Sequence, residues 1–252
     1  MKQLLFNCCN VFHFNRNGDS ILHFISKIGI TNLDIVKELV DYGANVHLKN
    51  KDGFTPLQIA VLQEEVEIVR ELLNLGAKIN TRNSRNETVI HLVANNGNVT
   101  ILKELLTYKN LELDLKCDSG EAPIHTAITN GYHEIVELLL QSGANVNLSR
   151  RFQHGSQCIH RSLHLASIFA DVEMVELLIK HGAKINFKKG CTPLEKAAIK
   201  GNAEIVKVLI KHGADLESKN IRGHTPLYLA LDFGNKEVVK NTVGTWRQGQ
   251  YQ

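Results

Sequence analysis

The sequence predicts an all-α solenoid, in which helix-loop-helix units stack side by side and are joined by hairpin-like loops. The triplet Thr-Pro-Leu recurs at 55–57, 192–194 and 225–227, although the 252 residues contain only four prolines. Aligning the chain on this triplet gives seven copies, and most of them close with Gly-Ala. A unit this short cannot bury an apolar face alone, so stability has to come from stacking the copies.

The first helix of each copy is predicted to begin at the triplet. Thr55 suits the N-cap, and Pro56 suits the first helical position because the N–H there has no partner. Three residues after the cap, Gln58 and Glu195 complete a reciprocal capping motif. Histidine stands at this position in other copies, and Ala122 replaces the capping Thr in copy four. The residues aligned with Thr55 are Ser20, Thr88, Ala122, Arg161, Thr192 and Thr225, and the histidines are His23, His91, His125 and His164.

The second helix follows after a turn. In copy two the stretch 66–76, VEIVRELLNLG, places its apolar residues on one face, as an amphipathic helix requires. Gly76 suits the left-handed conformation that follows a helix C-terminus. The buried side is predicted to contain Leu57, Ala60 and Val61 from the first helix and Ile68, Val69, Leu72 and Leu73 from the second.

The motifs DGFTPLQIA, GNAEIVKVLIKHGADLE and RGHTPLYLA closely resemble the ankyrin repeat. The resemblance covers residues 17–243, with an N-terminal cap segment at 1–16 and a C-terminal tail at 244–252. It implies an ankyrin-repeat solenoid that binds other proteins through its loop tips and inner helices. Seven repeats are expected, starting near residues 17, 52, 85, 118, 158, 189 and 222.

Two stretches depart from the repeat. Copy five carries an insertion at 149–161 that the repeat pattern does not explain. In copy seven, Thr242 and Val243 replace the usual pair of leucines, and the residues after them belong to no repeat. A polar outer face is normal for a terminal repeat, but an alternative ending of the chain fits equally well.

Composition restricts the cellular setting. Five cysteines without a framework spacing indicate free thiols in a reducing compartment, so we expect a cytoplasmic protein, with the nucleus as the alternative. No apolar run is long enough to span a membrane. The apolar N-terminal stretch is better explained as a cap over the first repeat than as a signal peptide or a lipidation site at Cys8 and Cys9.

The motifs give no support for catalysis or metal binding. His154, Cys158, His160 and His164 are four candidate ligands, but their spacing matches no known zinc module, and repeat packing already explains His164. The stretch HEIVE at 133–137 lacks the second histidine of the zinc-protease motif. We therefore expect no enzyme, no cofactor and no metal.

Charge is concentrated in the loops between the copies. Loops 48–54, 81–87, 115–121, 148–160, 187–191 and 218–224 contain eleven Lys and Arg against four Asp and Glu, whereas the net charge of the whole chain is only +3. If the tips align, they form a basic strip that would attract an acidic protein surface. The alternative is that these cations serve solubility alone. The candidate residues are Lys49, Lys51, Arg82, Arg85, Arg150, Arg151, Lys188, Lys189, Lys219 and Arg222, most concentrated at Arg150, Arg151, Lys188 and Lys189.

Nucleic acid is a less favoured partner than protein, because the tips lack interleaved aromatic residues. Asn80, Asn147 and Asn186 occupy a position that asparaginyl hydroxylases modify in other ankyrin proteins, so the resemblance implies hydroxylation there. Their structural alternative is hydrogen bonding to loop backbone.

The sequence therefore predicts a monomeric, non-catalytic scaffold or adaptor that binds a partner protein. The alternative is the target-recognition region of a larger protein, such as a ubiquitin-ligase adaptor, a channel or a toxin, whose effector domain lies elsewhere.

Overall fold

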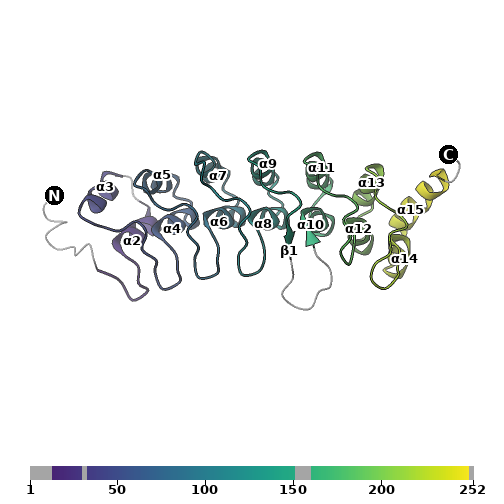
Figure 1. Ribbon diagram of the computed structural model, residues 1–252, viewed down its shortest axis with the longest axis horizontal. Helices are drawn as coiled ribbons and strands as arrows, with labels where there is room; N and C mark the ends of the chain where they lie inside the picture. The colour runs from purple at the N-terminus through teal and green to yellow at the C-terminus, as the bar shows by residue number, and fades with distance from the viewer. Residues whose placement is uncertain (1–12, 30–32, 151–159, 250–252) are drawn as a thin grey trace. The chain divides into compact units, whose positions relative to one another are not determined.

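The computed structural model describes residues 13–29, 33–150 and 160–249, which form fourteen helices and one pair of two-residue strands (Figure 1). The chain divides into two compact units, residues 1–118 and 119–252. The division falls after copy three, which lacks the Gly-Ala close. The predicted helical solenoid class is confirmed, and each unit is described separately.

Unit one consists of three helix pairs. Its inner helices α2, α4 and α6 pack in a row, and the outer helices α3, α5 and α7 form a second row (Figure 1). The pairs are α2 (Ile21–Ile28) with α3 (Asp34–Asp41), α4 (Pro56–Leu62) with α5 (Val66–Asn74), and α6 (Val89–Asn96) with α7 (Val99–Leu105).

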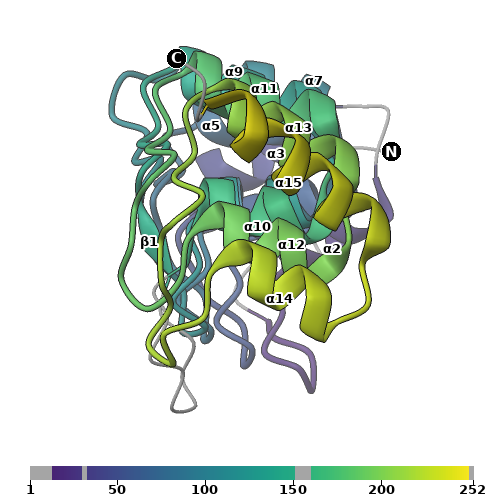
Figure 2. The same cartoon turned by 90° about the vertical axis from the view of Figure 1, so that its right-hand side faces the viewer.

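Unit two repeats this arrangement with four helix pairs. Inner helices α8, α10, α12 and α14 pack in sequence, with their partners on one side (Figure 2). The pairs are α8 (Pro123–Thr129) with α9 (His133–Gln141), α10 (Ser162–Phe169) with α11 (Val172–Lys180), α12 (Pro193–Lys200) with α13 (Ala203–Lys211), and α14 (Pro226–Asp232) with α15 (Lys236–Gly249).

The N-caps at Thr55 and Thr192 are as predicted, but of the two predicted reciprocal capping motifs only the one at Gln58 forms, because the Glu195 carboxylate contacts Ser218 instead. The Thr55 hydroxyl accepts a hydrogen bond from the Gln58 N–H, and the Gln58 side-chain oxygen accepts one from the Thr55 N–H. Thr192 Oγ1 likewise accepts from the Glu195 N–H at 3.2 Å. At Ala122 no hydroxyl is present, but the backbone N–H still donates to Nδ1 of His125 at 3.0 Å.

The residue three positions after the cap occupies what we call the bridging position, because in five of the copies its side chain also contacts the loop of the next copy. His164 shows the arrangement: Nδ1 accepts from the Arg161 N–H at 3.3 Å, and Nε2 lies 3.1 Å from the Cys191 carbonyl oxygen. Since Nδ1 is an acceptor, Nε2 carries the hydrogen and the neutral ring makes both bonds. Equivalent contacts join His23 to the Phe54 carbonyl, Gln58 to the Thr81 and Glu87 carbonyls, and His125 to the Leu148 carbonyl.

The predicted core residues of copy two are all buried. Gly76 has φ 84°, as predicted for the residue after a helix, and its N–H donates to the Leu73 carbonyl while the Ala77 N–H donates to the Leu72 carbonyl. These bonds satisfy helix-end carbonyls and turn the chain toward the next loop. The repeated Gly-Ala close therefore redirects the backbone at the end of each outer helix.

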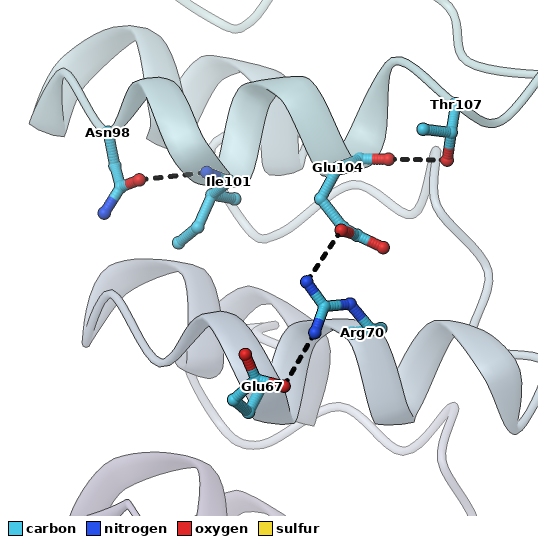
Figure 3. A network of polar contacts seen from close by, with 6 residues as sticks. All are labelled: Glu67, Arg70, Asn98, Ile101, Glu104 and Thr107. Atoms are coloured by element: carbon cyan, nitrogen blue, oxygen red, sulfur yellow. Dashed lines mark hydrogen bonds and ion pairs between the residues drawn. The ribbon is translucent and has the colours of Figure 1, made fainter.

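Polar contacts on the outer helices of unit one add a link between neighbouring copies (Figure 3). The Arg70 guanidinium bonds Glu67 on its own helix α5 at 2.7 Å and Glu104 on α7 at 3.1 Å. Asn98 caps α7 by accepting from the Ile101 N–H. Exposed pairs of this kind contribute little individually, so the buried stacking face carries most of the stability.

Two features differ from the sequence expectation. The insertion in copy five begins and ends in a short antiparallel pair, β1 (Ser149–Arg150) with β2 (His160–Arg161), whereas the sequence predicts only helices and loops. Helix α15 continues to Gly249 and takes in residues of the predicted 244–252 tail. The other outer helices of unit two have nine residues and α15 has fourteen.

The bridging histidines make the stability depend on pH. Burial lowers the pKa of His164 to about 4, and it also lowers the pKa of His23. Because an unfolded histidine titrates near 6.5, the stabilisation is complete above that pH and is lost as the pH falls from 6.5 toward 4. We expect the free energy of unfolding to fall over this range, by up to about 1.4 kcal/mol per pH unit for His164, with a further loss in the same direction from His23.

The substitution His164→Gln isolates this effect, because Gln58 makes both bonds at the same position in copy two. Urea denaturation at about pH 7 and about pH 5 should show a smaller loss of stability for this variant than for the unmodified protein. An identical loss in both proteins would contradict the assignment of a neutral, hydrogen-bonded His164.

Candidate protein-binding surface

Three of the loop tips are tight turns whose conformation is fixed by asparagine. Asn220 Oδ1 accepts from the backbone N–H groups of Arg222 and His224, at 2.9 and 3.0 Å. Asn50 and Asn83 make the same bonds in their own loops. Asparagine recurs at this loop position, and this recurrence is a signal in the sequence that the predictions above did not use. Cations at these tips are consequently held on an ordered backbone.

In unit one the candidate cations are mixed with acidic residues. Lys49, Lys51 and Arg85 are exposed. Arg82 is half-buried and donates from Nη1 to the Lys116 carbonyl at 3.3 Å, so it joins two neighbouring loops. The loops of this unit also contain acidic residues, which reduce the net positive charge; they are Asp52, Glu87 and Asp118.

In unit two Arg150 is engaged within the protein. Its guanidinium forms an ion pair with Glu121, and both side chains are largely buried. Strand β1 places Arg150 opposite His160 of β2. This pair therefore holds the base of the copy-five insertion against the preceding loop. Arg151, the next residue of the predicted strip, lies outside the described residues.

Arg161 is also used within the fold. Its guanidinium stacks on the ring of Phe187 at 3.5 Å, an arrangement that favours a cation. His160 and His164 lie beside it with ring centroids 5.8 Å apart. Burial lowers the pKa of His160 to about 4, helped by the positive charge of Lys196. This cluster fixes the loop before copy six and is not an exposed docking site.

Lys188, Lys189, Lys219 and Arg222 remain as exposed cations on the last two loops. Loops 187–191 and 218–224 contain no Asp or Glu, and no carboxylate in the described part of the chain lies within ion-pair distance of these four side chains. We call these four residues the basic tips. Ile221, between two of them, is also exposed.

The described residues do not assemble the metal site considered from the sequence, because His154 and Cys158 lie outside them. Three other side chains, His133, Asp171 and Glu173, do place their polar atoms within 4.8 Å of one another. Asp171 already accepts from the Met174 N–H at 2.9 Å as the N-cap of α11, and His133 Nε2 lies 2.8 Å from Asp171. That hydrogen bond is the main cause of the raised pKa of His133, so the group is explained as an ion pair between two copies.

The three asparagines proposed for hydroxylation join adjacent copies. Asn147 Nδ2 donates to the Gly182 carbonyl at 3.0 Å, and its Oδ1 accepts from the Lys184 N–H at 2.9 Å. Asn80 and Asn186 make the same pair of bonds to the backbone of the next copy. The structural role is therefore present, and hydroxylation stays a prediction.

The longest helix, α15, has 14 residues, and none of the helices in the described part of the chain combines the length and the apolar character that crossing a membrane requires.

Comparison with known protein families gives matches over most of the chain. A family model described as ankyrin repeats (3 copies) matches residues 1–83, 79–150 and 162–241, and a model described as ankyrin repeats (many copies) matches residues 124–179. No curated protein matches the chain significantly.

Two solved structures resemble most of the chain. The ankyrin repeat domain of Bcl-3, described as a unique member of the IkappaB protein family, is 28% identical, covers 89% of this chain and 98% of its own, and superposes with a TM-score of 0.77. The human ASB11 ankyrin repeat domain is 26% identical, covers 89% of this chain and 97% of its own, and has a TM-score of 0.70.

The two kinds of cation can be distinguished by mutation. Arg150→Ala leaves the largely buried Glu121 without its ion pair, so we expect the free energy of unfolding to fall by about 1–2 kcal/mol. Lys188→Ala removes an exposed, unpaired cation, and the change should stay within about 0.5 kcal/mol. Urea denaturation of both variants measures the difference. Equal losses would show that the division into structural and available cations is wrong.

Proposed function

Since this chain belongs to the ankyrin repeat family, whose repeats generally mediate protein–protein interaction, we propose that it is a non-catalytic scaffold or adaptor that binds an acidic protein surface. The observation that carries the proposal is the set of basic tips, Lys188, Lys189, Lys219 and Arg222. They are exposed, they lie on consecutive loops, and those loops contain no acidic residue.

The other cations of the loops have roles within the fold. Arg82, Arg150 and Arg161 have partners in the same chain, so structural needs account for them. In the described part of the chain the side chains of the basic tips form no ion pair, and the charge of exposed cations favours encounter with an acidic surface. The inner helices offer a second contact surface, as the family resemblance implies.

We place this activity in a reducing compartment, the cytoplasm or the nucleus. Neither Cys117 nor Cys191 is joined in a disulfide, and Cys191 is buried in the fold. The proposal requires no metal, cofactor or catalytic residue.

A second candidate is that these repeats are the target-recognition part of a larger protein. The observation favouring it is that both solved relatives are described as the ankyrin repeat domain of a named protein. The basic tips would then select the target, and a different domain would act on it.

The proposal predicts that charge reversal at the tips abolishes partner capture. The variant Lys188→Glu, Lys189→Glu, Lys219→Glu should lose proteins that the unmodified chain retains from a cell lysate. A matched control reverses three other exposed cations of unit two, Lys180, Lys184 and Lys211. Bound proteins are identified by mass spectrometry, and thermal melts establish that both variants are folded.

We expect the unmodified chain and the control to bind a set of acidic proteins that the tip variant does not bind. Raised salt should release these proteins, because it screens exposed charges. Capture of the same proteins by all three chains would contradict binding through the tips.

A further inference from the structure

The last copy exposes side chains at positions that are buried inside each unit. In the copies that are followed by another copy of the same unit, the residue six positions after the N-cap is completely buried. In the last copy the equivalent residue, Leu231, is 60% exposed, and Tyr228 at the bridging position is 49% exposed. The buried equivalents of Leu231 are Ser26, Val61, Ile128, Ser167 and Ala198.

These residues share one face of α14. Tyr228, Leu231 and Asp232 are spaced i, i+3 and i+4, so they lie on the same side of the helix. The Tyr228 ring packs on His224 with a centroid distance of 4.1 Å, which holds it in place on this side. Of the nine exposed large apolar side chains among the described residues, four lie between Ile221 and Phe233. We call Tyr228, Leu231 and Asp232, with Arg222 on the adjoining loop, the end face.

The described chain does not turn back to cover the end face. Other outer helices of unit two end after nine residues and lead to the next loop, whereas α15 continues to Gly249. Figure 2 views the protein from this end and shows α14 and α15 nearest the viewer. In the described part of the chain, an apolar surface equivalent to a buried stacking face is thus left open.

We propose that the end face binds a second copy of this chain, related to the first by a two-fold axis, with the two α14 helices antiparallel. Charge complementarity favours a second copy as the occupant. Arg222 precedes the N-terminus of α14 and Asp232 is its last residue, and both are exposed. Antiparallel packing brings Arg222 of each chain beside Asp232 of the other, and Leu231 lies between the two pairs.

A two-fold contact is self-complementary, so one patch that contains both an apolar centre and a charge of each sign is sufficient for both partners. The pairing also sets the helix dipoles antiparallel, which is favourable. This proposal departs from the sequence-based expectation of a monomer. It does not depend on the proposed binding of an acidic partner, although the dimer engages Arg222 and leaves Lys188, Lys189 and Lys219 for that partner.

Sedimentation equilibrium of the full chain over roughly 1 to 100 µM tests the proposal, because a small interface has a dissociation constant in this range. We expect a monomer–dimer equilibrium. Leu231→Asp should abolish the dimer. Phe169→Asp is the matched control, since Phe169 is 54% exposed on α10, outside the end face, and this variant should dimerise normally. A chain that is monomeric throughout this range would overturn the proposal.

Exchanging the charges at positions 222 and 232 distinguishes a specific two-fold contact from nonspecific association. Arg222→Glu and Asp232→Lys each place like charges opposite each other, so each should weaken the dimer by about tenfold or more. The double variant restores opposite charges and should recover the dimer. Failure of the double variant to recover it, with all three variants folded by circular dichroism, would overturn the antiparallel arrangement.

Capture of the acidic partner tests the proposed function independently of dimerisation. Leu231→Asp leaves the basic tips unchanged and should still bind partner proteins as a monomer. The tip variant leaves Leu231, Arg222 and Asp232 unchanged and should still dimerise. Loss of dimerisation in the tip variant but not in Leu231→Asp would contradict the end face as the contact.

Discussion

The structure depends on the side chain at the bridging position, which joins the first helix of one copy to the loop of the next. In copy two Gln58 accepts from the Thr55 N–H and donates to the carbonyls of Thr81 and Glu87. His23, His125 and His164 make equivalent contacts in their copies. Removing such a side chain takes a hydrogen bond from both a loop carbonyl and a helix-end N–H, which is costly in a protein interior. Stacking and loop conformation are therefore coupled.

This coupling explains why the loops can present charge. The bridge fixes the base of a loop, and in several loops an asparagine such as Asn220 fixes the tip. Cations at the tips then fall into two groups. Arg150 and Arg161 hold loops together through Glu121 and Phe187, and the basic tips are left available for a partner. The end face is exposed for a related reason: Tyr228 occupies the bridging position of a copy that no further described copy covers.

Helix starts and turns that are set by residues close together in the sequence could be predicted from it. Thr55 and Pro56 begin α4 as expected, and Gly76 ends the turn after α5. The β1–β2 pair could not be predicted, because two-residue strands are too short to show a period. The Arg150–Glu121 pair joins two different loops, and nothing in either loop alone indicates it. Leu231 stands at a stacking position in the repeat pattern, and the structure shows that this position is exposed in copy seven.

If the bridging residue orders the next loop, as we infer, amide hydrogen exchange shows it most directly. In His164→Ala the Cys191 carbonyl loses its hydrogen bond to the ring, so amides in loop 187–191 should exchange faster, while loop 218–224, bridged by Glu195, should be unaffected. His164→Gln should retain slow exchange in both loops. Unchanged exchange at 187–191 in His164→Ala, or an equal rise in both loops, would contradict the account.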